Sequence, residues 1–267
     1  MPKIEEPEES KSAASSCFEG FRLEDHFDSP RKRVSGDRFI KRLRRPTRPF
    51  WLAWFRRLKA SRSMREMRCY DILRRIGVPC PRDVQVHEER SFLGFLRYSE
   101  ISMELIRDAV DLKFLATLSC FSGLRENTRW RKAVVRTAAR WIRHMHENGF
   151  YNSKLHFGNI MVVPDPEAPE VKMYFIDVTG GPLSFLATRD RSRMKDVAYL
   201  YPDAMRWCTP RERILFMHEF LGTRKLSDSH RRFIDDIIRY STRKKKIKAY
   251  LSQRRRASKA NVNNYFK

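Results

Sequence analysis

Apolar residues recur at helical spacing in two parts of the chain and alternate with polar residues in others. Helical spacing predicts a helix over Ser63–Ile76, which Gly77 ends, and a longer helix over Asn127–Asn148. Strand-like alternation predicts two strands, one near Phe92–Leu96 and the other near Ser99–Leu105.

The two halves of the chain differ in this pattern. The first half mixes strands and helices, and Arg38–Lys41 is one predicted strand. The second half is mainly helical, apart from a hairpin of Ile160–Val163 with Val171–Ile176, and closes with helices at Arg211–Leu221 and Arg231–Tyr240. We therefore expect an α+β protein with a disordered segment at residues 1–18, a mixed unit at 19–108, a helical unit at 109–257 and a tail at 258–267.

The charge of the chain points to an anionic partner. The formal net charge is +24, and basic residues concentrate in the runs Arg31–Arg45, Arg56–Arg68 and Arg243–Arg256. Any one run can be a solvated face, but three runs with few acids favour a shared polyanionic partner. No run of about 20 apolar residues is present, and the acidic first residues lack the features of a secretion signal. We expect a cytoplasmic protein.

The most informative pattern follows the long predicted helix. Gly149 ends that helix, a polar loop carries Asn159, and the second strand of the next hairpin ends at Asp177. An amide and a carboxylate from adjacent loops supply the hard oxygen ligands that Mg²⁺ takes. Phosphotransferases hold a metal-bound triphosphate in this way, so Asn159 and Asp177 are candidate metal ligands. The alternatives are a loop-capping amide for Asn159 and an ion-paired carboxylate for Asp177.

This stretch resembles the H-x-D-x-x-x-x-N loop and the metal-binding Asp of kinases, and the chain from Val34 to Leu251 resembles the Kdo/WaaP lipopolysaccharide kinase family. The resemblance implies a two-lobed protein-kinase-like fold, ATP and Mg²⁺ as cofactors, and a heptose or Kdo sugar of the lipopolysaccharide core glycolipid as substrate. It also implies that Lys41 contacts the nucleotide phosphates, that Glu66 pairs with Lys41, and that Glu104 lies near the hinge.

Some of these residues have simpler explanations. Lys41 can be a solvated lysine, and Glu66 can pair along its own helix with Arg62 or Arg65. The segment Arg193–Ala198 resembles the family's segment after the metal-binding Asp. Within it, we interpret Asp196 as structural, holding the catalytic loop by hydrogen bonds.

The catalytic loop departs from the family at its most important position. Lys154 stands five residues before Asn159, where kinases carry the catalytic Asp, and Asn152 stands where they usually carry His. Lys154 can stabilise charge on the transferred phosphoryl group, and His156 can act as a substitute base. Alternatively, the substitution marks a pseudokinase in which Lys154 neutralises Asp177 and fills the metal position.

Three functions compete on this evidence. The first is an ATP-dependent kinase of a lipopolysaccharide core sugar, peripheral to the anionic surface of the inner membrane, which would account for the basic charge. The second is a pseudokinase that binds nucleotide or glycolipid and regulates lipopolysaccharide assembly. The third, nucleic-acid binding, explains the charge but not the loop spacing, and the sequence carries no recognised nucleic-acid-binding motif. We expect no nucleic-acid partner.

Overall fold

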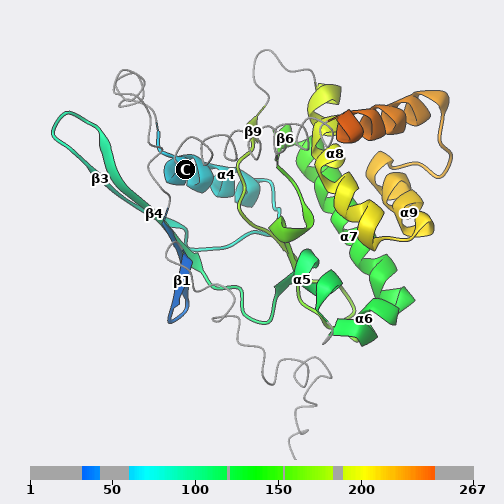
Figure 1. Ribbon diagram of the computed structural model, residues 1–267, viewed down its shortest axis with the longest axis horizontal. Coiled ribbons are helices and arrows are strands. Elements are labelled where there is room, and N and C mark those ends of the chain that lie inside the picture. The colour runs from blue at the N-terminus through cyan, green and yellow to red at the C-terminus, as the bar shows by residue number, and fades with distance from the viewer. Residues whose placement is uncertain (1–31, 43–59, 119–120, 153, 183–188, 244–267) are drawn as a thin grey trace, which may run out of the picture.

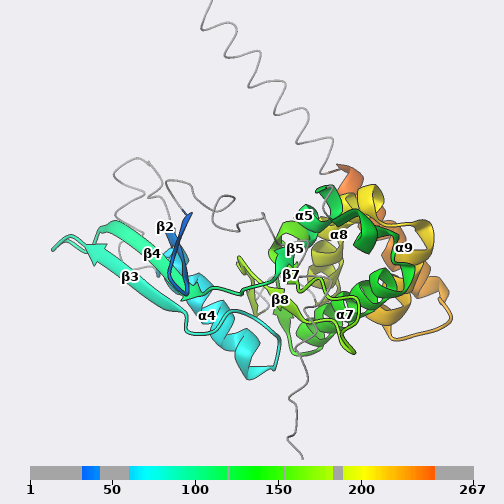
Figure 2. The same cartoon turned by 90° about the horizontal axis from the view of Figure 1, so that it is seen from below.

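The computed structural model describes residues 32–42, 60–118, 121–152, 154–182 and 189–243. Figure 1 shows a strand-rich part that carries β1–β4 and a helix-rich part that carries α5–α9, and Figure 2 shows the same separation from a second direction. The predicted segments 1–18 and 258–267 and nearly all of the basic run Arg243–Arg256 lie outside the described residues. The boundary expected at residues 108 and 109 stays a prediction.

The strand-rich part is a four-stranded antiparallel sheet. Its strands, in the order β1-β2-β4-β3, are β1 (Lys32–Ser35), β2 (Arg38–Arg42), β3 (Gln85–Arg90) and β4 (Leu96–Glu104). The predicted strand Arg38–Lys41 is confirmed as β2. Its central place in the sheet puts Lys41 directly opposite Ile101 of β4.

The strand predicted near Phe92–Leu96 is wrong, because these residues form most of the turn between β3 and β4. Gly94 has a φ of +81°, a left-handed conformation that glycine adopts without steric cost. The backbone N–H of Ser91 donates to the carbonyl of Phe95 at 2.8 Å and closes the turn. The strand predicted near Ser99–Leu105 is confirmed within β4, which begins earlier and ends one residue before Leu105.

One long helix, α4 (Arg62–Arg75), packs against β3 and β4. It confirms the helix predicted over Ser63–Ile76. Ser61 caps its N-terminus, because its hydroxyl accepts the N–H of Met64 at 3.0 Å. The apolar face of α4 buries Tyr70 and Leu73 completely, which fixes the helix on the sheet.

The helix-rich part holds short strands among its helices. Its elements are β5 (Val110–Asp111), α5 (Leu112–Thr117), α6 (Ser122–Glu126), α7 (Thr128–Glu147), β6 (Phe150–Tyr151), the short 3-10 helix η2 (Phe157–Asn159), β7 (Ile160–Val162), β8 (Met173–Phe175), β9 (Gly181–Pro182), α8 (Arg189–Trp207) and α9 (Pro210–Leu221). Residues 228–243 are also helical. The predicted long helix, the hairpin and both closing helices are confirmed.

Helix α7 forms the centre of this part and packs along α9. Asn127 caps it by accepting the N–H of Trp130 at 2.9 Å. Its buried side chains recur every three or four residues, so one face of the helix enters the core. None of the described helices is both long and apolar enough to cross a membrane.

Candidate functional site

A cavity of about 210 Å³ lies where β2, α4 and the end of β4 meet the β7–β8 hairpin. Five residues singled out from the sequence line it together: Lys41, Glu66, Glu104, Asn159 and Asp177. They come from five different places in the chain, and the folding of the sheet onto the hairpin brings them to one space. Lys154 and His156 do not line this cavity.

Lys41 occupies the centre of the charged part of the cavity. Its ammonium lies 3.3 Å from both carboxylate oxygens of Glu66 and 2.7 Å from Oδ1 of Asp177. Lys41 is 9% exposed and Glu66 is 1% exposed. The ion pair predicted between them is therefore present and buried. The alternative in which Glu66 pairs only along its own helix does not describe this structure.

Asp177 is held in place by its backbone as well as by its side chain. Its φ is +49°, a left-handed conformation that aspartate tolerates better than most residues. Its N–H donates to the hydroxyl of Tyr70 at 2.9 Å, and Tyr70 is fully buried on α4 one turn after Glu66. Arg62, at the start of α4, places Nη2 3.5 Å from Asp177 Oδ1. The sequence reasoning missed Tyr70, although its position four residues after Glu66 puts it on the same helical face.

The two carboxyl groups of the cavity respond differently to their surroundings. Burial raises the pKa of Glu66, and the charge of Lys41 offsets only part of this effect. Burial also acts to raise the pKa of Asp177, but the charge and hydrogen bond of Lys41, with the charge of Arg62, outweigh it and lower the pKa. Asp177 is thus held as a carboxylate, the form that a cation binds.

Asn159 joins the catalytic loop to the hairpin. Its side-chain amide N–H donates to the carbonyl of Lys154 at 3.2 Å, and its own carbonyl accepts the N–H of Ile176 at 3.0 Å. The side chain is 4% exposed. Within the described residues its amide oxygen accepts no hydrogen bond, so that oxygen is available to a ligand in the cavity.

The start of the catalytic loop is fixed from beneath by Asp196 of α8. Its carboxylate Oδ2 accepts the backbone N–H of Asn152 at 2.7 Å and contacts Nε2 of His146 at 3.0 Å. Asp196 is 1% exposed, and burial raises its pKa while the contact with His146 acts in the opposite direction. The structural interpretation of Asp196 is confirmed. His146 was missed, because its place near the end of a long helix gives no sequence signal for this contact.

Lys154 and His156 lie at the outer side of the loop. Both are exposed, whereas Leu155 between them is fully buried. Among the described residues, the Lys154 ammonium forms no ion pair. The pairing of Lys154 with Asp177 considered from the sequence is absent, because Lys41 and Arg62 occupy the Asp177 carboxylate instead.

The opposite end of the cavity is less charged. Met103, Leu105 and Ile106 line it together with Glu104, which ends β4. Asp111 lines it too, and its carboxylate caps α5 by accepting the N–H groups of Lys113 and Phe114, each at 2.9 Å. Burial raises the pKa of Asp111 despite these two hydrogen bonds. This end therefore combines apolar side chains with two acids, whereas the lysine lies at the other end.

The donor set fits a magnesium–nucleotide complex. The Asp177 carboxylate and the free amide oxygen of Asn159 face one cavity, and both are hard oxygen ligands. No group of three or more acidic, histidine or cysteine side chains is placed to hold a metal ion in the described part of the chain. A cation bound here therefore needs further oxygens from phosphate or water, which is how Mg²⁺ is commonly held beside nucleotides.

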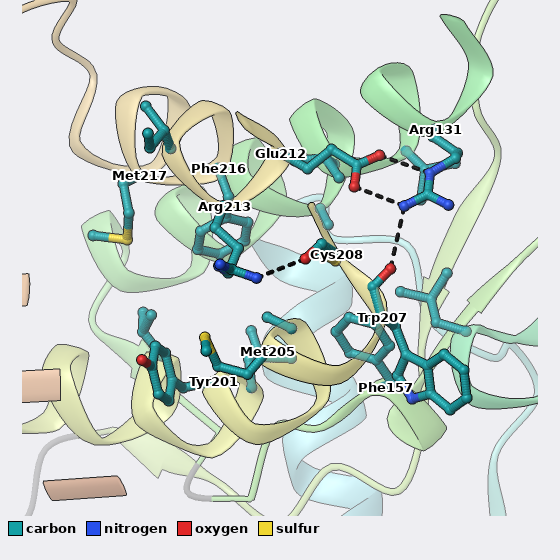
Figure 3. Close-up of a pocket in the computed structure, with 18 of the residues that line it drawn as sticks. Arg131, Phe157, Tyr201, Met205, Trp207, Cys208, Glu212, Arg213, Phe216 and Met217 are labelled. Carbon is teal, nitrogen blue, oxygen red and sulfur yellow. Dashed lines mark hydrogen bonds and ion pairs between the residues drawn. The ribbon is translucent and has the colours of Figure 1, made fainter. Parts of the chain in front are cut away.

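A second, larger cavity of about 490 Å³ lies among α5, α7, α8, α9 and the helical residues 228–243 (Figure 3). Its wall is mainly aliphatic and aromatic, and Met205 and Ile214 on its rim are 49% and 54% exposed. Arg131 on one side is bound to both carboxylate oxygens of Glu212 at 2.7 Å. Arg213 donates to the carbonyl of Cys208 at 2.7 Å. This cavity was not predicted, because it arises from how five helical segments pack rather than from any motif.

Comparison with known proteins gives a family and a likeness to solved structures. The model of the lipopolysaccharide kinase (Kdo/WaaP) family matches residues 43–220. No curated protein matches the sequence at a significant level. Among solved structures, "WaaP in complex with acyl carrier protein" superposes with a TM-score of 0.55 and 20% sequence identity, covering 81% of this chain and 85% of that chain. The α+β, protein-kinase-like fold expected from the sequence is confirmed.

Proposed function

The chain belongs to the lipopolysaccharide kinase (Kdo/WaaP) family, and on that premise we propose that it transfers the γ-phosphoryl group of ATP to a heptose or Kdo sugar of the lipopolysaccharide core. One observation carries the proposal. Lys41, Glu66, Asn159 and Asp177 meet in one cavity, with Lys41 bridging two carboxylates before any ligand is present.

Each of these side chains has a definite task in such a reaction. Lys41 binds phosphate oxygens of the nucleotide, and Glu66 keeps its ammonium pointed into the cavity. Asn159 and Asp177 hold Mg²⁺, which neutralises charge on the phosphates when it is bound. Tyr70 fixes the backbone of Asp177, so the carboxylate is positioned before the nucleotide arrives.

The acceptor side of the reaction relies on the catalytic loop. Phosphoryl transfer passes through a loose transition state, so positioning and charge stabilisation supply most of the rate enhancement. A general base adds about 10²–10⁴-fold. Lys154 stands at the position of that base and cannot accept a proton while charged. Lys154 instead stabilises the negative charge on the transferred phosphoryl group, and His156 accepts the proton of the sugar hydroxyl.

A specific observation also favours a second candidate, the pseudokinase. The residue at the position of the catalytic Asp is a lysine, and neither Lys154 nor His156 faces the cavity. In this case the protein binds nucleotide or glycolipid through the same cavity and regulates lipopolysaccharide assembly without phosphoryl transfer. The two candidates agree on binding and differ only in turnover.

The experiment that separates them is transfer of labelled γ-phosphate from ATP to purified core glycolipid. The kinase predicts labelled glycolipid with the wild type and none with Asp177→Ala. A wild-type protein that binds Mg-ATP and labels no core glycolipid would reject the kinase in favour of the pseudokinase. Absence of nucleotide binding would reject the kinase and leave only a pseudokinase that binds glycolipid.

The basic charge is assigned to attachment at the anionic surface of the inner membrane. Each lysine or arginine near such a surface contributes about 1 kcal/mol, and salt screens the attraction. Binding to vesicles that contain phosphatidylglycerol is expected to weaken as salt rises. Binding that is absent at low salt would remove this explanation of the +24 charge.

The larger cavity supports a protein partner as well. The structure of WaaP that this chain resembles was solved with acyl carrier protein, and an apolar space of about 490 Å³ suits an acyl chain. Filling the space with Ala138→Phe is expected to weaken binding of acylated carrier protein and to leave ATP binding unchanged. Equal binding of the acylated carrier by both proteins would reject this assignment.

A further inference from the structure

The turn between β3 and β4 exposes two adjacent apolar side chains. Phe92 is 96% exposed and Leu93 is 45% exposed. Figures 1 and 2 both show the β3–β4 hairpin extending away from the rest of the molecule, and these residues lie in the turn at its far end. Single exposed apolar residues are ordinary. A neighbouring pair at the end of a projecting hairpin is positioned to meet a partner before the rest of the surface does.

Hydrogen bonds within the turn hold its backbone in place. The N–H of Ser91 donates to the carbonyl of Phe95 at 2.8 Å, and the N–H of Gly94 donates back to the carbonyl of Ser91 at 2.8 Å. The Ser91 hydroxyl also accepts the N–H of Phe95 at 3.1 Å. These bonds hold the turn without any partner. Binding through Phe92 and Leu93 therefore requires little ordering of the backbone, which lowers the entropic cost of association.

Two arginines bracket the apolar turn. The segment Arg90–Arg97 contains both of them and no acidic residue. Arg90 donates to the Glu88 carboxylate at 3.0 Å and to the carbonyl of Gly94 at 3.3 Å, so its guanidinium is held beside the turn and is paired with one acid. Arg97 is exposed at the start of β4 and forms no ion pair among the described residues. Long basic side chains reach lipid phosphates while their neighbours enter the apolar layer. The chain as a whole carries a formal net charge of +24, and this positive charge favours an anionic bilayer as the surface that the turn meets.

We propose that this turn, residues 91–95, inserts into the interface of an anionic phospholipid bilayer. Phe92 and Leu93 enter the boundary between head groups and acyl chains, and Arg90 and Arg97 remain at the level of the phosphates. The proposal deepens the membrane attachment given under the proposed function and rests on that part of it, but it does not depend on phosphoryl transfer.

Strand β4 connects the inserted turn to the nucleotide cavity. It runs for nine residues from Leu96 to Glu104, and Glu104 lines the cavity. At about 3.3 Å per residue, the strand holds the cavity no more than about 30 Å from the turn. Pairing with β2 and β3 makes this connection stiff. An inserted turn therefore sets both the height and the orientation of the cavity above the bilayer, where the sugars of a glycolipid are exposed.

The test is flotation of the full chain with vesicles of phosphatidylethanolamine and phosphatidylglycerol, without nucleotide, at low and high salt. The double variant Phe92→Ser/Leu93→Ser is expected to bind at least about tenfold more weakly than the wild type, because two apolar side chains no longer leave water. The matched control Phe92→Trp/Leu93→Trp keeps apolar contact and is expected to bind as well as the wild type. Thermal unfolding of both variants should match the wild type, since the replaced side chains are exposed.

Two outcomes would overturn the proposal. If the double-serine variant binds vesicles as the wild type does, the turn is not inserted, and a protein partner becomes the explanation of its exposure. If the wild type binds but loses all binding at high salt, attachment is electrostatic alone. Failure of the kinase function is a separate result. It would abolish phosphate transfer in every protein, while the difference in vesicle binding between wild type and double-serine variant would remain.

Discussion

Lys41 and Lys154 belong to neighbouring regions of the candidate site, and the fold treats them in opposite ways. Lys41, in the nucleotide cavity, is 9% exposed and contacts the carboxylates of Glu66 and Asp177. Lys154, on the catalytic loop, is exposed and forms no ion pair within the described part of the chain. A buried charge is costly unless it is paired, and the carboxylates of Glu66 and Asp177 provide that pairing for Lys41. The exposed side chain of Lys154 has no such requirement, so it remains available to contact a substrate.

This contrast separates binding of the nucleotide from transfer of its phosphoryl group. The binding region brings Lys41, Glu66 and Asp177 to one cavity, and the hydrogen bond from the Asp177 N–H to the Tyr70 hydroxyl fixes the backbone of Asp177. The loop is anchored at its base by Asp196, and Asn159 binds the backbone carbonyls of Lys154 and His156, but the side chains of these two residues are exposed. Nucleotide binding can therefore be expected from the geometry alone, whereas transfer depends on what Lys154 and His156 do when an acceptor is present.

The largest expected effect comes from removing the carboxylate of the binding region. Asp177→Ala takes away a charged oxygen ligand and leaves Lys41 with one partner. Phosphate transfer is expected to fall by about 100-fold or more, and Mg²⁺-dependent binding of ATP should fall sharply because a hard cation loses its ligand. Calorimetry with and without Mg²⁺ measures the binding, and a labelled-phosphate assay measures the transfer.

The control for this substitution is Asp190→Ala. The side chain of Asp190 is 86% exposed and lies 3.9 Å from Arg193 at the start of α8. Its removal is expected to change neither the affinity for Mg-ATP nor the rate of transfer. Unchanged Mg-ATP affinity in Asp177→Ala would remove the basis for calling this cavity the nucleotide site.

The next largest expected effect is on stability, and it differs between two buried carboxylates that pair with cations, Glu66 and Glu212. Burial raises the pKa of Glu66 above 4.5, while the contacts of Glu212 with Arg131 and Thr209 outweigh burial and lower its pKa below 4.5. A lowered pKa means that Glu212 stabilises the fold above pH 4.5 and that this contribution is lost as the pH falls through the lowered value. A raised pKa means the reverse for Glu66, whose charge costs stability as the pH rises through and above 4.5.

The two glutamine variants test this difference. At pH 7, Glu212→Gln is expected to lose about 2 kcal/mol of unfolding free energy, because a hydrogen-bonded charge pair is broken. Glu66→Gln is expected to lose little or none, because glutamine resembles the protonated form that burial favours, yet it should weaken ATP binding. Denaturant unfolding from pH 4 to pH 8 measures both. Equal losses of stability in the two variants would contradict the opposite pKa shifts.

Sequence reasoning succeeded where local spacing determines geometry. The interval from the end of α7 to Asn159 and Asp177 fixes a loop and a hairpin, and five residues of the cavity could be named from it and from the resemblance. It failed where the answer depends on tertiary packing. The segment from Phe92 to Leu96 has the apolar side chains that are typical of a strand, but the turn at Gly94 interrupts the pairing of β3 with β4 there. Arg62 and Tyr70 reach Asp177 across the fold, and although Tyr70 shares a helical face with Glu66, the spacing along the chain does not specify these contacts.

The larger cavity illustrates the same limit. Its walls come from residues as far apart as Leu112 and Ile238, and each wall reads from the sequence as an ordinary core face. Periodicity reports that a helix has an apolar side. It does not report whether the neighbouring helices fill the space beside it.

The smallest expected effect concerns Lys154 and His156, the two exposed residues of the catalytic loop, and it decides the function. If the loop is a working variant, Lys154→Ala and His156→Ala should each lower phosphate transfer by about tenfold, below the full contribution of a base because positioning and charge carry most of the catalysis. ATP binding should be unchanged in both, because neither side chain lines the cavity. If the protein is a pseudokinase, the wild type shows no transfer, and Lys154→Asp restores a carboxylate at the position of the kinase base and gains some. Single-turnover assays with core glycolipid, run beside calorimetry with ATP, measure both quantities. Transfer by the wild type that survives both alanine substitutions at full rate would show that neither residue acts, and that the cavity alone catalyses the reaction by positioning its nucleotide.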